Sequence, residues 1–382
     1  MKIKIFQSLT QISEKNWIKI TPMDFPFASY HFLSGLEATG CLGSRTGWGP
    51  VYLTAWQNED LIGAIVAYLK TNSYGEYIFD FAWAQAHESM GIAYYPKLVM
   101  AVPFTPATGP KILMSPDLEP SLQIETRTAL LQALDQWSAE TKASSNHALF
   151  IPQAEIPSFE QAGFFIRQSF QFQWQNKGFK SFDAFMESLR GKRRKEIRRE
   201  RAMVTESQVT IQRLTGAQLK PHYAELMYEF YLSTIDKRQG MDYLTLDFFK
   251  KIFSTMADQI LFILATNSSG LDVAGALCFY HGSVLFGRNW GCLEEYKSLH
   301  FELCYYQGIE FAIENKLKLF EAGAQGEHKF QRGFLPVLTY SAHRVKNSQL
   351  NLPIQDYVNH EKIQIEKIIT DYMAHSPFSN SV

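Results

Sequence analysis

The sequence predicts an α/β protein made of two similar halves, and three observations lead to this prediction. A chain of 382 residues is long for a single hydrophobic core, so two domains are expected. In the first half, apolar runs typical of strands are grouped before the longest stretch of helical spacing, and a similar order returns in the second half. A polar break at residues 175–178 separates the halves, so we predict domains over residues 1–178 and 179–382.

The first half alternates between strand and helix signals. The longest predicted helix carries Leu130, Leu134 and Trp137 at helical spacing, and the polar turn at residues 57–60 separates the first two strands. Strands are predicted over residues 51–56, 61–69, 77–83, 97–102, 148–151 and 170–174, and helices over residues 26–36, 84–92 and 124–141.

The second half repeats these signals. Its three central strands form a meander, in which His281 and Gly282 predict a tight second turn. Strands are predicted over residues 209–214, 260–265, 273–280, 283–290, 317–321 and 337–343, and helices over residues 217–235, 246–256, 299–315 and 354–372.

The basic segment, residues 182–204, opens the second half and holds the densest charge in a chain of formal net charge -1. Ser181 can cap a first helix, and a second helical run follows Gly191. The segment is either a solvated surface helix or a docking surface for a polyanion such as a tRNA backbone, a nucleotide diphosphate or an anionic lipid surface. Its cations, opposed only by Glu196 and Glu200, are Arg190, Lys192, Arg193, Arg194, Lys195, Arg198, Arg199 and Arg201.

Composition excludes several classes of protein. A near-neutral net charge argues against a general nucleic-acid coat protein, so any anion site must be local. The sequence contains no run of eighteen apolar residues and no export signal, so we expect a cytoplasmic protein without a membrane span. The cysteines are expected to be reduced and mostly buried, because they lack paired C-x-x-C spacing; they are Cys41, Cys278, Cys292 and Cys304.

Known catalytic motifs give no support to hydrolysis or nucleotide chemistry. The sequence contains no H-E-x-x-H, G-x-S-x-G or P-loop motif, and we expect no metal site. His343, within a predicted strand, is expected to be a core or edge histidine.

The order of elements in the second half resembles the GNAT acyltransferase fold, and two such units in tandem resemble the FemAB-like family. The resemblance rests on the basic residues 192–201 and on four further stretches, residues 236–241, 288–291, 300–306 and 326–333. These stretches are similar to a branch labelled peptidoglycan biosynthesis or recognition. The resemblance implies two GNAT-like units, each with a mixed central sheet flanked by helices.

The same resemblance implies an activity. Fem-type relatives transfer an amino acid from aminoacyl-tRNA to an amine on a peptidoglycan precursor. Ordinary GNAT enzymes hold the pyrophosphate of coenzyme A in a glycine-containing loop before the third helix, where backbone N–H groups converge. The corresponding residues 294–300 contain no glycine and two acids. Binding of acetyl-CoA by the second domain is therefore not expected, and aminoacyl-tRNA is favoured as the donor.

Acyl transfer to an amine needs a base and groups that stabilise the oxyanion. Glu327 or His328 could serve as the base, and Lys329 and Arg332 could hold a phosphate or a carboxylate. Alternatively, this stretch could be an exposed loop with a helix cap and a salt bridge. Glu302 is a third catalytic candidate, since it lies with His300 in the first turn of the predicted helix 299–315; there it could also serve only to complement the helix dipole.

Other residues are expected to contact the donor or the substrate. Asn289 and Trp290 lie at the end of the fourth strand of the second half, which splays open in the GNAT fold, so they could contact a carbonyl and form an aromatic wall. Lys237 and Arg238 end a helix and could either bind substrate or compensate the helix dipole. In the basic segment, the predicted donor-binding residues are Lys192, Arg193, Arg194, Lys195 and Arg198.

Three functions remain open from the sequence. The first is an N-acyltransferase that moves an aminoacyl or acyl group to an amine, possibly one on a peptidoglycan precursor, with tRNA as a partner. The second is an acyl-CoA-dependent N-acetyltransferase. The third is a non-catalytic module that recognises an envelope precursor or RNA. Salt sensitivity separates them in part, because a tRNA donor held through several phosphates loses far more affinity with salt than a thioester donor does.

Overall fold

The computed structural model describes residues 1–324 and 326–379, without the side chain of Arg238. The chain forms two compact units: unit 1, Met1–Phe170 with Leu338–Ile368, and unit 2, Gln171–Val337 with Ile369–Val382. It leaves unit 1 within strand β7 (Phe165–Gln175) and returns to it within strand β13 (Leu335–Val345). The predicted division into domains after residue 178 stays a prediction.

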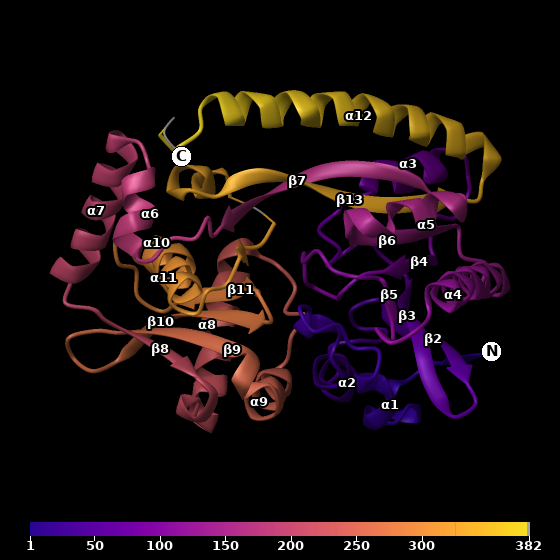
Figure 1. Ribbon diagram of the computed structural model, residues 1–382, viewed down its shortest axis with the longest axis horizontal. Helices are drawn as coiled ribbons and strands as arrows, with labels where there is room; N and C mark the ends of the chain where they lie inside the picture. Colours follow the sequence, from indigo (N-terminus) through magenta and orange to yellow (C-terminus); the bar gives the residue numbers. More distant parts are fainter. Residues whose placement is uncertain (325, 380–382) are drawn as a thin grey trace. The chain divides into compact units, whose positions relative to one another are not determined.

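Unit 1 contains a mixed sheet with the strand order β1-β2-β3-β4-β6-β13, and β5 pairs with β3 (Figure 1). The pair β4 and β6 is parallel, whereas the other pairs of unit 1 are antiparallel. The strands are β1 (Lys2–Phe6), β2 (Trp48–Gln57), β3 (Asp60–Lys70), β4 (Lys97–Met100), β5 (Ile112–Met114) and β6 (Ser145–Ile151). The helices are α1 (Glu14–Ile18), α2 (Tyr30–Ala38), α3 (Phe81–Ser89), α4 (Pro120–Glu140), α5 (Ile156–Gln161) and the first part of α12 (Ser348–Ala374).

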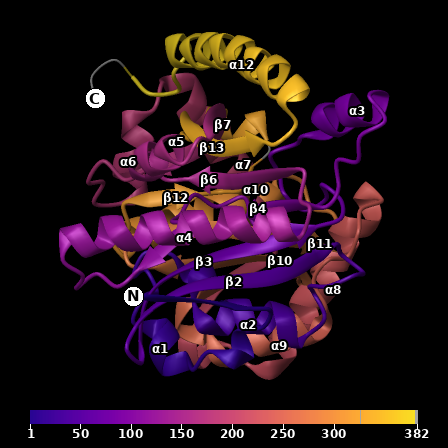
Figure 2. The ribbon, with the colours of Figure 1, turned by 90° about the vertical axis from the view of Figure 1, so that its right-hand side faces the viewer.

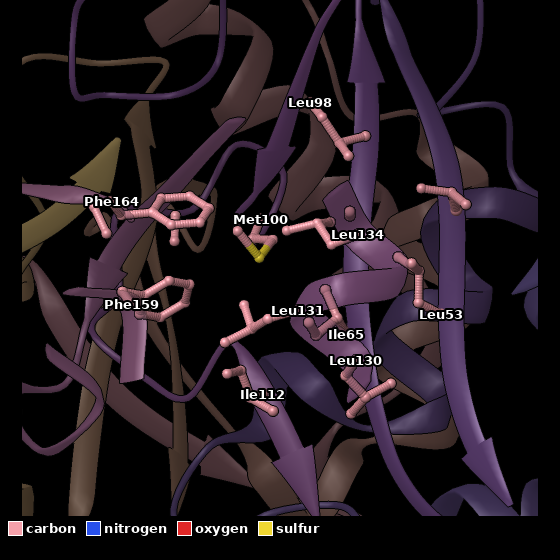
Figure 3. Packing of buried hydrophobic residues seen from close by; sticks show 14 of the residues in the cluster. Leu53, Ile65, Leu98, Met100, Ile112, Leu130, Leu131, Leu134, Phe159 and Phe164 are labelled. Atoms are coloured by element: carbon pink, nitrogen blue, oxygen red, sulfur yellow. The ribbon is translucent and has the colours of Figure 1, made fainter. Parts of the chain in front are cut away.

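The core of unit 1 lies between helix α4 and the sheet. Helix α4 runs across β2 and β3 (Figure 2), and it contacts both strands. Leu130, Leu131 and Leu134 of α4 are buried in one cluster with Leu53 and Ile65 (Figure 3). The helical spacing of these leucines is therefore the signal that places α4 on the sheet.

The strand predicted over residues 77–83 is wrong. Tyr77 has a φ of 64°, which interrupts an extended strand, and helix α3 begins at Phe81. The carboxylates of Glu76 and Asp80 are buried on the ammonium group of Lys97, so they fix this segment as a turn. The alternating apolar pattern of residues 77–83 resembled that of a strand, but it did not reveal this buried ion-pair cluster. The prediction also missed β1 and β5.

A buried polar network extends from this cluster into the sheet of unit 1. The hydroxyl of Tyr94 donates a hydrogen bond of 2.5 Å to Asp80. His147 on β6 and His343 on β13 share a hydrogen bond of 2.7 Å between their Nδ1 atoms, and both are buried. The prediction that His343 lies in the core or at an edge is confirmed. Burial is the main cause that holds the pKa of His147 well below 6.5, and the nearby cations Lys97 and Arg167 lower it further. Burial is also the main cause that holds the pKa of His343 well below 6.5, and His147 adds to it.

These depressed pKa values predict that the protein loses stability in mild acid. Unfolding returns the pKa of His147 and His343 to about 6.5, so above pH 6.5 both histidines are neutral in the folded and the unfolded state and cost no stability. Below pH 6.5 the unfolded state binds protons that the folded state excludes, and each histidine then costs about 1.4 kcal/mol per pH unit. Urea unfolding between pH 7.5 and 5.5 measures this loss. A H147Q/H343Q variant should show a smaller dependence on pH, and an unchanged dependence would contradict the prediction.

The strands of unit 2 have the order β8-β9-β10-β11-β12-β7, and their pairing is also mixed. The pair β11 and β12 is parallel, and the other pairs are antiparallel. The strands are β8 (Thr210–Thr215), β9 (Ile260–Thr266), β10 (Asp272–His281), β11 (Val284–Cys292) and β12 (Leu319–Glu321). The helices are α6 (Phe182–Ser188), α7 (Gly191–Glu206), α8 (Pro221–Arg238), α9 (Leu246–Thr255), α10 (Leu299–Phe301) and α11 (Gln307–Glu314).

The two units therefore share one arrangement: four antiparallel strands, a parallel partner and a final antiparallel strand. In each unit, a helical crossover connects the two parallel strands, as a parallel pair requires. The predicted repetition of an α/β order is confirmed. Among residues 1–324 and 326–379, no helix combines the length and the apolar character needed to cross a membrane.

Candidate functional site

The basic segment forms helices α6 and α7 of unit 2, and α7 carries most of its cations. Ser181 caps the preceding helix α6 by accepting a hydrogen bond of 3.1 Å from the backbone of Ala184, as predicted. Ile197 and Val204 are buried and fix the inner face of α7. The outer face exposes four cations that form no ion pair with any described residue: Lys192, Lys195, Arg198 and Arg199.

The other cations of this segment have structural partners. Arg193 pairs with Glu196 at 2.6 Å. Arg194 donates to the backbone oxygen of Leu189 at 2.6 Å, close to the start of α7. These two side chains, predicted to bind the donor, therefore already contribute to the helix. The exposed cations are the ones available to an incoming polyanion.

The inner face of α7 is joined to two irregular helical segments by ion pairs. Arg201 donates to both carboxylate oxygens of Glu302, at 3.1 and 3.0 Å, and to Glu310 at 2.6 Å. Glu200 accepts two hydrogen bonds from Arg332, at 3.2 and 2.6 Å, and another from the hydroxyl of Tyr306. Bidentate pairs of this kind fix orientation as well as distance. Helix α7 is thus connected to the segments that carry the candidate catalytic residues.

The first irregular segment is a π-helical turn, Glu302–Tyr306, between α10 and α11. The single helix predicted over residues 299–315 is therefore interrupted. Turns of this type are frequent at functional sites, because the extra residue turns side chains out of helical register. Here the turn directs Glu302 toward Arg201, while the hydroxyl of Tyr305 lies 2.8 Å from Nε2 of His328.

The second irregular segment is the 3-10 helix Glu327–Arg332. His328 is exposed, and its ring lies 5.7 Å from that of His300 and 5.6 Å from that of Phe301. Partial burial of the imidazole is the main cause that lowers the pKa of His328 below its ordinary value, and the charges of Arg332 and Lys329 lower it further. His328 is therefore neutral at pH 7 and able to accept a proton.

Lys329 is buried in the same segment, with 2% of its surface exposed. Its ammonium group donates to the backbone oxygen of Gly323 at 2.7 Å. Burial lowers the pKa of Lys329 to about 8, and no carboxylate among the described residues pairs with it. An anion reaching this amine would therefore gain a strong partner.

A pocket of about 370 Å³ opens beside the end of β11. Strand β11 pairs with β12 only over Val284–Phe286, so Trp290 and Cys292 lie beyond the part of β11 that pairs with β12. The rings of Trp290 and His300 meet edge to face there, 4.9 Å apart. The pocket is lined by Thr234, Lys237, Trp290, Cys292, Glu294, Glu295, Tyr296, Leu299 and His300.

Outside α7, the predicted site residues differ in where they lie. Lys237, Trp290 and His300 line the pocket, and His328 contacts His300. Glu302 and Arg332 connect α7 to the site through their ion pairs. Asn289 does not line the pocket, and the side chain of Arg238 lies outside the described residues.

Glu327 is exposed and accepts a hydrogen bond from Tyr372. Of the two predicted bases, His328 is therefore the one in contact with the pocket residue His300.

Several residues of the site were not predicted from the sequence, among them Glu200, Tyr305, Tyr296 and the pocket acids Glu294 and Glu295. Glu200 lies three residues after Ile197 and four before Val204, so helical spacing could have indicated that it faces inward with them. Tyr305 gave no signal, because the π-helical turn that presents it to His328 has no clear sequence pattern. Tyr296 lies in a stretch that was described only by its lack of glycine and its two acids.

Gly291 controls how closely α8 approaches the pocket strand. A Cβ atom at this position would lie 1.6 Å from the backbone oxygen of Phe230 in α8. We expect G291A to push α8 away from β11 and to lower the free energy of unfolding by about 3 kcal/mol, the upper part of the usual range for overpacking. Thermal and urea unfolding measure this loss. Gly191 is the matched control, because a Cβ there has no neighbour closer than 3.8 Å; equal stability of both variants would contradict the prediction.

Comparisons with known proteins identify the family of this chain and the class of its fold. The sequence matches the FemAB-like family, described as peptidoglycan biosynthesis/recognition, over residues 8–380. The structure is similar to that of FemX, with a TM-score of 0.54 and 11% identity over 92% of this chain and 99% of that chain. No curated protein matches the sequence significantly.

Two further solved structures are similar. L-PGS from Bacillus licheniformis has a TM-score of 0.51 and 10% identity over 85% of this chain and 93% of that chain. The C-terminal domain of a putative lysylphosphatidylglycerol synthetase from Agrobacterium fabrum has a TM-score of 0.56 and 9% identity over 92% of this chain and 96% of that chain. These likenesses establish the fold and confirm the tandem fold class expected from the sequence.

Proposed function

Because this chain belongs to the FemAB-like family, we propose that it is an N-acyltransferase that moves an aminoacyl group from tRNA to an amine, with a peptidoglycan precursor as the acceptor. One observation carries this proposal. The exposed cations of α7 have no described partners, while the inner face of the same helix is joined through Arg332 to the segment that carries His328. A polyanion bound on the outer face would therefore lie against an element that positions the candidate base.

In the proposed reaction, the acceptor nitrogen attacks the carbonyl carbon of the aminoacyl ester. A C–N bond forms, the ester C–O bond breaks, and the amine proton passes to the ribose oxygen that leaves. His328 accepts this proton and returns it to the leaving oxygen, which suits an imidazole that is neutral at pH 7. Lys329, which no described carboxylate pairs with, is proposed to hold an anionic group of a substrate, whereas Arg332 is already bound to Glu200 and serves to position α7 against this segment.

The test is the binding of labelled total tRNA and of acetyl-CoA by the full chain at 50 and 200 mM salt. We expect tRNA to bind and its affinity to fall steeply with salt, because each phosphate contact adds about 0.7 to 0.9 to the slope of log affinity against log salt. The variant K192A/K195A/R198A/R199A should reduce this slope by about 3, since it removes four phosphate partners.

A matched control removes the same charge elsewhere. The variant K15A/K220A/K251A/K318A changes four exposed lysines on other elements, and it should keep most of the tRNA affinity. Tight binding of acetyl-CoA without binding of tRNA would overturn the proposal in favour of an acyl-CoA donor. If tRNA binds but no aminoacyl transfer to an amine is detected, the protein is a recognition module.

A further inference from the structure

We propose that the pocket beside β11 binds a small primary amine in its ammonium form, namely the α-ammonium end of the transferred aminoacyl group. This inference rests on the proposed function, because that function supplies the ester to which the amine is attached. The charges, the aromatic faces and the size of the pocket each support it.

The charge of the pocket favours a cation. Glu294 and Glu295 both line it, and the one cationic side chain among its lining residues, Lys237, is bound to Glu295 at 2.7 Å. Glu294 accepts hydrogen bonds from the hydroxyl of Tyr296 at 2.8 Å and from the amide of Asn267 at 3.3 Å. Two neutral donors thus orient this carboxylate without cancelling its charge, so it is available to an ammonium group.

The aromatic residues of the pocket favour the same ligand. Trp290 and Tyr296 both contribute to its lining, and the face of an aromatic ring attracts a cation through its quadrupole. The edge-to-face contact with His300 fixes the orientation of the Trp290 ring. A carboxylate beside aromatic faces is an arrangement suited to an alkylammonium group.

The same features disfavour the diphosphate of coenzyme A. Two carboxylates at the pocket repel phosphate, and the glycine-free stretch at residues 294–300 offers no nest of backbone N–H groups. A volume of about 370 Å³ is near the lower limit of ordinary ligand sites, which suits an aminoacyl group better than a whole thioester donor.

The test is a titration of the full chain with L-alanine methyl ester at pH 6.5, in which the heat of binding is measured by calorimetry. The comparison ligand is N-acetyl-L-alanine methyl ester, which has the same ester but no charge. We expect the amine probe to bind up to about fivefold more tightly than the acetylated one, the most that a single partly exposed ion pair usually contributes. E294Q should remove most of this difference, whereas E206Q, which changes an exposed acid on α7, should leave it intact.

Equal binding of both esters, or binding of the amine ester that E294Q leaves unchanged, would overturn the inference. Displacement of the amine probe by coenzyme A would also overturn it, because the pocket would then accept a diphosphate. Since the probe contains no nucleic acid, this assay can succeed while tRNA binding fails, and it can fail while tRNA binding succeeds. Failure of this inference and failure of the proposed function are therefore distinguishable.

Discussion

Replacement of Lys97 by methionine is expected to lower the free energy of unfolding by about 3–5 kcal/mol, the usual cost of removing one partner from a buried ion pair. Lys97 is fully buried and binds both Glu76, at 2.8 Å, and Asp80. Burial raises the pKa of Asp80, but the Lys97 ammonium outweighs burial and holds it below the ordinary value. The variant would leave this carboxylate charged in a dry environment without its cation.

Urea unfolding at pH 7.5 measures the expected loss. Two further variants identify its cause. K97M/D80N removes the unpaired charge as well and should recover part of the stability, because asparagine can still accept from Tyr94. K220M makes the same side-chain change at an exposed position and should have little effect. A K97M protein as stable as K220M would show that the buried pair contributes nothing.

The second large effect concerns catalysis. If His328 is the base, H328Q should lower kcat of aminoacyl transfer by about 10²–10⁴-fold, the usual range for loss of a general base. Glutamine can still form a hydrogen bond with Tyr305, so KM for the donor should change little. Single-turnover transfer from charged tRNA to an amine measures both quantities.

The pH profile adds a readout that a structural defect would not reproduce. The rate of the natural protein should fall in acid as His328 becomes protonated, with a midpoint below the ordinary value of 6.5 because its pKa is lowered. H328Q should lack this acid limb. The control H222Q changes an exposed histidine in α8 and should retain both the rate and the profile. Retention of a third or more of kcat by H328Q would exclude His328 as the base.

Much of the fold could be predicted from local patterns. The spacing of the leucines of α4, and of Ile197 and Val204 of α7, indicates which face of each helix is buried, because a helix repeats every 3.6 residues. Helix α8 ends at Arg238, so Lys237 and Arg238 do end a helix, although the helix begins and ends later than the predicted residues 217–235. Patterns failed where distant residues decide the conformation, as at Asp80, whose partner Lys97 is far along the chain.

The candidate site was predictable only in part. Trp290 and His300 were placed by their positions at the ends of two elements, and both line the pocket. The partners of Glu302 and Arg332 could not be predicted, since the pairing of α7 with these segments depends on how helices pack in three dimensions. Which cations of α7 remain exposed follows from the same packing.

The late return of the chain to unit 1 has a consequence during synthesis on the ribosome. Strand β6 ends at Ile151, but its antiparallel neighbour β13 begins only at Leu335. At translation speeds of about 5–20 residues per second, β6 waits roughly 10–40 s with one edge uncovered. A nascent chain with an open apolar edge is prone to pair with other chains. Efficient production of this protein should therefore depend on chaperones that shield nascent chains, and a fragment ending before β13 would never bury that edge.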